Sequence, residues 1–376
     1  MFESIKSYFS IKTIKKMKCP IVRVLRAFPK AQSAMCDDVL RLVLTNAGTD
    51  CRCSCSSWRD LYDSCTHALT LDGKRALQLS DKSIERRLIG LFRRGSLTLT
   101  SLTLHGATST FVHALVPALE QLIHLKTLDL SENGLGADNL AVLSPGLQRL
   151  TTLERLNLGG NDLRAEGIRA LVPTLQRLPM LVSLDLSGNF MRADGVCALA
   201  AALKGLPGLA SLNLSGSYLQ AGGARALAPA LEPLTGLTAL HLTQNFLCAD
   251  AAAALAPALL RLTAIGTLDL DHNCLGDKGV AALAPALQRL PALGALNLNF
   301  NNLGERGARA LASALQSMTA LTSLKVFRGD HKPYAEVAAT NAVMMPVLDQ
   351  LSGLAFLNGV PVLGVSKMPG LVCSRF

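Results

Sequence analysis

From residue 265 the chain reads Ile265-Gly-Thr-Leu268-Asp-Leu270-Asp-His-Asn273-Cys-Leu275, and after a short turn it continues Gly279-Val-Ala-Ala-Leu-Ala-Pro-Ala-Leu-Gln-Arg-Leu290. The first half alternates leucine with polar residues, which is the period of a strand with one buried face. The second half has apolar residues at the i, i+3, i+4 and i+7 spacing of a helix with one buried stripe. The stretch therefore predicts one short strand followed by one helix.

This 28-residue unit occurs seven times between residues 125 and 320 without insertion or deletion. The copies start at Leu125, Leu153, Leu181, Leu209, Leu237, Ile265 and Leu293. A fixed period of this length predicts a solenoid, in which each unit covers the bare apolar face of its neighbour. We expect an α/β fold, a right-handed curved solenoid with a parallel concave sheet and convex helices. The repeat overrules the two or three domains that length alone would suggest.

Weaker copies extend the predicted solenoid to residues 68–362. Strands are expected at 68–71, 99–104, 321–326 and 354–357, and helices at 80–94 and 334–349. A proline recurs at one register of the repeat helix, as at Pro285, and is expected to kink or interrupt it because proline lacks a backbone donor.

The ninth position of the unit is asparagine in six of the seven copies. Asparagine there can hydrogen-bond the buried backbone of the turn with both its donor and its acceptor. Ser217 occupies this position in one copy and has fewer groups to offer, so that turn is expected to be the loosest. A strand, an asparagine turn and a helix in 28 residues resemble the ribonuclease-inhibitor-like class of leucine-rich repeats.

The net charge of +10 is concentrated at the N-terminus. Residues 1–34 hold eight Lys and Arg against Glu3, which leaves only +3 for the rest of the chain. This basic leader is either disordered, foreign to the native protein, or an organelle-targeting or membrane-surface segment. No run approaches the roughly 18 apolar residues of a membrane span. Residues 363–376 form a C-terminal tail.

Ten scattered cysteines and no export signal indicate a reducing compartment, so we expect the cytoplasm, with the nucleus left open. Cys51, Cys53 and Cys55 have poor spacing for zinc, even with Cys65 and His67 nearby, and no metal is predicted. The motifs of nucleotide-binding, metalloprotease and serine-hydrolase sites are absent. We therefore expect neither catalysis nor a cofactor.

Residues 35–67 form a separate segment before the solenoid. Its helix candidate at 35–44 and the stretch around the single tryptophan resemble an F-box, although the opening Leu-Pro is replaced and the spacing is about one helical turn short. The residues that fit are Val39, Leu40, Val43, Leu44, Trp58 and Leu61. The resemblance implies docking on the Skp adaptor of a cullin–RING ubiquitin ligase, with the solenoid holding the substrate. The alternative is a helical cap in which Trp58 plugs the solenoid core.

Two further functions stay open. Activators of the Ran GTPase share this repeat type, but they carry an acidic C-terminal tail that this chain lacks. The second open function is that of an adaptor without any ligase role. In each case we expect a protein partner on the solenoid and a monomer outside the complex.

Two surfaces are candidates for that partner. The concave face carries a polar ladder at the fifth position, and its near-neutral charge argues against nucleic acid. The turn beside each strand carries aromatic residues at the tenth position in three successive copies, with arginines beside them, which suits a binding hot spot. The candidate residues are Phe190, Tyr218, Phe246, Arg155, Arg164, Arg192, Asp129, Asp185, His241 and Asp269.

Overall fold

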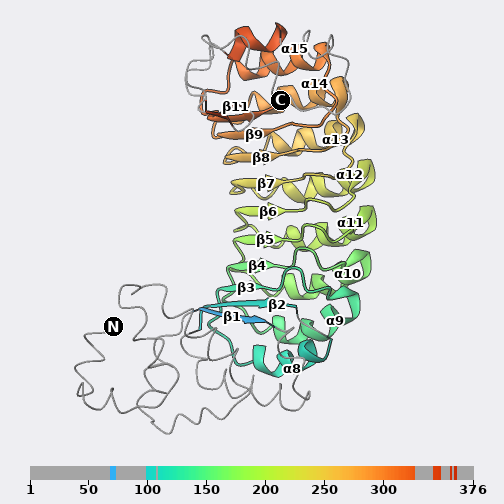
Figure 1. Cartoon of the computed structure of the whole chain (residues 1–376), viewed down its shortest axis with the longest axis vertical. Coiled ribbons are helices and arrows are strands. Elements are labelled where there is room, and N and C mark those ends of the chain that lie inside the picture. Colours follow the sequence, from blue (N-terminus) through green and yellow to red (C-terminus); the bar gives the residue numbers. More distant parts are fainter. Residues whose placement is uncertain are drawn as a thin grey trace, which may run out of the picture.

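The computed structural model describes residues 68–72, 99–106, 109–326, 342–348, 356–357 and 360–361. Their strands form one open sheet of twelve strands, ordered as they occur in the chain. Neighbours from β1 to β11 pair in parallel, and β12 pairs antiparallel with β11. Figure 1 shows the strands stacked along one side of an elongated body and the helices along the other. The predicted two-layer solenoid is confirmed.

Most strands are three residues long and most helices are eleven or twelve. The strands are β1 (Ala68–Asp72), β2 (Ser101–His105), β3 (Thr127–Asp129), β4 (Arg155–Asn157), β5 (Ser183–Asp185), β6 (Ser211–Asn213), β7 (Ala239–His241), β8 (Thr267–Asp269), β9 (Ala295–Asn297), β10 (Ser323–Lys325), β11 (Phe356–Leu357) and β12 (Val360–Pro361). The helices are α8 (Ser109–Leu119), α9 (Gly136–Leu147), α10 (Arg164–Leu175), α11 (Arg192–Leu203), α12 (Gln220–Leu231), α13 (Ala249–Leu259), α14 (Gly276–Leu287) and α15 (Glu305–Leu315). Residues 342–348 are also helical.

The core lies between the two layers. The leucines at the fourth and sixth positions of the seven strict copies are at most 2% exposed, as at Leu184 and Leu186. They meet the buried stripe of the helices, which in α11 includes Val196, Leu199 and Leu203. Burying one such side chain contributes about 1.5–3 kcal/mol. Because every copy buries the same positions, the apolar core is continuous along the stack.

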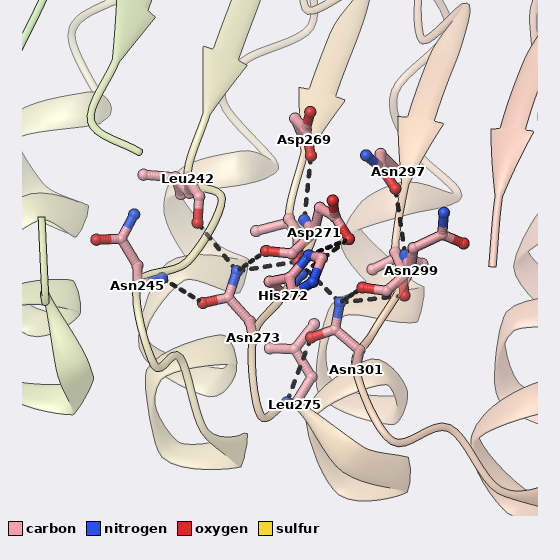
Figure 2. A network of polar contacts seen from close by, with 12 residues as sticks. Leu242, Asn245, Asp269, Asp271, His272, Asn273, Leu275, Asn297, Asn299 and Asn301 are labelled. Carbon is pink, nitrogen blue, oxygen red and sulfur yellow. Dashed lines mark hydrogen bonds and ion pairs between the residues drawn. The ribbon is translucent and has the colours of Figure 1, made fainter. Parts of the chain in front are cut away.

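The asparagines tie each turn to the preceding copy. The side-chain amide of Asn273 donates to the carbonyls of Leu270 in its own copy and Leu242 in the copy before, both at 2.9 Å. Its Oδ1 accepts the N–H groups of Asn245 at 2.9 Å and Leu247 at 3.0 Å. Figure 2 shows Asn245, Asn273 and Asn301 in successive turns, with the bonds that join Asn273 to Asn245 and Leu242. The predicted role of the ninth position is confirmed.

Ser217 interrupts this asparagine ladder. Its Oγ is buried and has no hydrogen-bond partner, and Ser217 as a whole is 0% exposed. Two copies further along, the N–H groups of Asn245 and Leu247 donate to the Oδ1 of Asn273. The N–H groups of Asn189 and Met191 hold the same positions beside Ser217. The shorter serine side chain does not supply that acceptor. The turn at Ser217 therefore lacks hydrogen bonds that the asparagine turns make, as the fewer polar groups of serine predict.

The prolines do not interrupt the helices, which corrects one expectation. Each lies in the last turn, two residues before the end of its helix, as Pro229 does in α12. A proline there removes a single hydrogen bond close to where the helix ends in any case. The others are Pro117, Pro145, Pro173, Pro257 and Pro285.

The flanking copies are present in part. β1, β2, β10 and β11 lie where strands were predicted, and the helix at 342–348 lies inside the range expected for the last one. β12 was not predicted. The predicted helix at 80–94, the leader at 1–34, the segment at 35–67 and the tail at 363–376 lie outside the described residues.

Candidate functional site

Three aromatic side chains stand in line on the turns that connect β5, β6 and β7 to the helices that follow. Phe190, Tyr218 and Phe246, here called the aromatic strip, are 46%, 38% and 49% exposed. The ring centroids of Phe190 and Tyr218 are 5.5 Å apart, and those of Tyr218 and Phe246 are 5.0 Å apart. Both distances lie in the contact range of aromatic pairs. The predicted apolar strip therefore exists as one continuous exposed surface.

The backbone beneath the strip is left-handed. The φ angles of Phe190, Tyr218 and Phe246 are 50°, 57° and 54°, whereas the first copy has Gly134 at this position with φ 58°. A left-handed backbone costs a residue with a Cβ about 1–2 kcal/mol. The three copies therefore place large, half-exposed rings where glycine would be less strained. Asp162 and Asn302 have φ 51° and 57° at this position in two further copies, so the left-handed turn belongs to the repeat.

Arginines flank the strip at the starts of α10 and α11. Arg164 forms two hydrogen bonds of 3.0 Å with the carboxylate of Asp162, and this contact raises the pKa of Arg164 above its ordinary value. Arg192 is exposed. A surface hollow of about 300 Å³ is lined by Arg192, Ala193, Asp194, Tyr218 and Gln220. A guanidinium and a tyrosine ring thus border the same hollow.

The polar ladder of the concave face has a local structural role. The Oδ1 atoms of Asp129 and Asp185 each accept the N–H of the residue two positions on, at 2.9 Å, and Asp269 does so at 3.1 Å. These bonds hold the turns that leave the strands. His241 is half-buried in β7, and Arg155 is exposed in β4. The three rings of the aromatic strip contact one another on the surface, whereas the carboxylates of the ladder bond to the turns of their own copies.

A second aromatic contact lies outside the strip. The rings of His272 and Phe300 are stacked, with centroids 3.9 Å apart, on the turns of two successive copies. The φ angles of His272 and Phe300 are 47° and 52°. Three other copies have glycine at this position, namely Gly160, Gly188 and Gly216. This glycine was the sequence signal that the position is left-handed.

Other predicted sites are not placed by the structure. The F-box-like residues Val39, Leu40, Val43, Leu44, Trp58 and Leu61 lie outside the described residues. Within the described part, no group of three or more His, Cys, Asp or Glu side chains could hold a metal ion. No helix in that part is long and apolar enough to cross a bilayer.

Comparison with known proteins agrees with the repeat. Four stretches, 121–142, 149–172, 266–284 and 293–312, match the family model described as Leucine Rich repeat. Among solved structures, the chain is similar to an internalin from Listeria monocytogenes, at 18% identity and a TM-score of 0.33, over 91% of this chain and 98% of that one. It is also similar to the leucine-rich repeat-containing protein LegL7 from Legionella pneumophila, at 22% identity and a TM-score of 0.45, over 78% and 94% of the two chains. No curated protein matches the sequence.

The 28-residue period and the parallel sheet define a solenoid of strand–helix units, and four of its stretches match leucine-rich repeats. Solenoids of this kind present extended surfaces for binding.

The contribution of the strip to stability can be tested with two neighbouring residues. Phe190→Gly is expected to change the free energy of unfolding by less than about 1 kcal/mol, because the lost ring contact is offset by relief of left-handed strain. Met191→Ala is the matched control: Met191 is 0% exposed, so its truncation is expected to cost about 2–5 kcal/mol. Urea unfolding followed by circular dichroism measures both. Equal losses for the two variants would show that the ring belongs to the core.

Proposed function

We propose that this chain is a protein-binding scaffold that holds its partner at the aromatic strip. The observation that carries the proposal is the row of three exposed aromatic rings in contact with one another. A contiguous exposed apolar patch marks an interaction surface, whereas single exposed apolar residues are common on any protein.

The chemistry of the strip favours a protein segment as its partner. Aromatic rings and arginine are the residue types most enriched at binding hot spots. Apolar side chains of the partner would pack on the three rings. The guanidinium of Arg192 and the hydroxyl of Tyr218 would hydrogen-bond its carbonyl or carboxylate groups at the shared hollow. The polar ladder beside β3 to β9 would form the hydrated rim.

The more specific proposal is that the chain is the substrate receptor of a cullin–RING ubiquitin ligase. In this arrangement residues 35–61 dock on the Skp adaptor and the solenoid presents the substrate. Support comes from the F-box-like residues that precede the repeats. We assign the repeats to the ribonuclease-inhibitor-like class, since a helix of eleven or twelve residues accompanies every strict strand.

Mixing the full chain with purified Skp adaptor tests the receptor role. Co-elution in size-exclusion chromatography is expected for the native chain. It is expected to be lost when Val39→Asp, Leu40→Asp and Trp58→Ala are combined, because a small helical interface depends on a few buried anchors. The melting midpoint should stay unchanged in that variant.

A second triple variant, Phe190→Ser with Tyr218→Ser and Phe246→Ser, is the control and should retain full adaptor binding. If the native chain does not bind the adaptor, and the first variant instead loses several kcal/mol of stability, residues 35–61 are a cap on the solenoid core. The ligase role then fails, while the proposal for the strip stands.

A further inference from the structure

One joint of the solenoid differs from its neighbours. A joint is here the contact between the turns of two successive copies. At the two joints within the aromatic strip, the N–H at the twelfth position donates to the ninth-position carbonyl of the next copy. These bonds run from Arg192 to Ser217 at 2.9 Å and from Gln220 to Asn245 at 3.0 Å. At the following joint this bond is replaced: the N–H of Cys274 donates to the carbonyl of Leu247 at 3.1 Å. The exchange occurs where Cys248 holds the twelfth position and Cys274 the tenth of the next copy.

The backbone changes at both cysteines. Arg192 and Gln220 have φ 54° at the twelfth position, whereas Cys248 has φ −86° and ψ −175° and is extended. Phe246 has φ 54° at the tenth position, whereas Cys274 is not among the residues with positive φ. Both cysteines have therefore left the left-handed conformation that their counterparts adopt.

The new hydrogen bond brings the backbone of Cys274 next to that of Cys248, because its acceptor is the carbonyl of the residue before Cys248. In a parallel pair, a residue that donates to the carbonyl preceding a second residue lies beside that second residue. Adjacent parallel strands are about 4.8 Å apart, and the Cα atoms of a disulfide are usually about 4.4–6.8 Å apart. Arg192 and Tyr218, which hold the same two positions two copies earlier, line a common hollow.

We propose that Cys248 and Cys274 are the site of a reversible disulfide between two repeats. Cys274 is exposed and Cys248 is half-buried, so the thiol of Cys274 is the one that an oxidant meets first. Two residues before Cys248 stands Phe246, the last ring of the aromatic strip. The bond would therefore fix the turn that presents this ring.

The oxidant is a low-molecular-weight disulfide such as glutathione disulfide. The thiolate of Cys274 attacks one of its sulfur atoms, forms a mixed disulfide and releases one thiolate. The thiolate of Cys248 then attacks the Cys274 sulfur and displaces the second thiol. The two cysteines together lose two electrons and two protons, and one small disulfide is reduced to two thiols.

Peptide mapping of the full chain tests this. The protein is incubated with glutathione disulfide, blocked with iodoacetamide and digested with trypsin. The fragments 226–261 and 262–278, which hold Cys248 and Cys274, are expected to appear joined, with a mass two hydrogens below their sum. Dithiothreitol should separate them. The fragment 193–204 with the exposed Cys197 is the internal control and should stay unjoined.

Two conservative variants identify the order of attack. Cys248→Ser is expected to leave Cys274 as a stable mixed disulfide with glutathione, and Cys274→Ser to leave Cys248 largely unmodified. The proposal is overturned if both cysteines of the native chain are alkylated separately after oxidation. It is equally overturned if the fragment 262–278 joins other cysteine-bearing fragments as readily as it joins 226–261.

Discussion

Replacing Leu212 by Asp is expected to unfold the centre of the solenoid. Leu212 in β6 is 0% exposed, and it lies in register with Leu184 and Leu240 of the neighbouring strands. A carboxylate there would face only apolar side chains and would remove the buried leucine as well. The loss is expected to be about 5 kcal/mol or more, since the cavity and the desolvated polar group both contribute. Neighbouring copies should unfold with it, because each repeat is stable only against the next.

The adjacent residue provides the control. Ser211→Asp places the same charge one position earlier, on the half-buried concave side of β6. Its cost is expected to stay below about 1 kcal/mol, as for most substitutions away from the core. Thermal unfolding followed by circular dichroism compares the two variants. If Leu212→Asp melts at the native temperature, the assignment of buried and exposed positions in the repeat is wrong.

The sequence determined the strands, the core and the asparagine ladder because repetition averages out local ambiguity. A single stretch such as Ala295–Asn297 is too short for its period to be decisive. Seven copies in one register leave no other alignment of the leucines. Rules about single residues transferred less well. The prolines were expected to kink or interrupt the helices, but their effect depends on the distance to the helix end, which the period does not give.

The candidate site was predictable only in part. The order of the copies placed Phe190, Tyr218 and Phe246 on successive turns, and the ring contacts follow from that spacing. The left-handed backbone and the stack of His272 on Phe300 depend on φ angles that the apolar pattern does not encode. Comparing columns of the repeat for glycine would have indicated them. The replacement of a backbone hydrogen bond at Cys248 could not be predicted from the sequence in this way, because a single cysteine in one column of the repeat is not unusual.

Ser217→Asn and Asn273→Ser are expected to shift stability in opposite directions. Asn273 is 2% exposed, and its Oδ1 accepts two N–H groups while its amide donates to buried carbonyls. Serine cannot reach all of these partners, and each buried group left unpaired costs about 1–3 kcal/mol. We therefore expect Asn273→Ser to lower the free energy of unfolding by about 2–4 kcal/mol.

In the reverse change, an asparagine at position 217 would offer Oδ1 to the N–H groups of Asn189 and Met191, as Asn245 does for Ser217 and Leu219. It would also replace the unpartnered Oγ of Ser217 by an amide with carbonyl partners. The gain is expected to be about 1–2 kcal/mol. Urea midpoints measure both variants, and exchange of the Asn189 and Met191 amide protons should slow in Ser217→Asn. A fall in stability would show that the space beneath Tyr218 does not admit the larger side chain.

Tyr218 follows Ser217 directly and is the middle ring of the aromatic strip. A stabilised Ser217→Asn variant would therefore also reveal whether partner binding at the strip depends on a loose turn at Ser217.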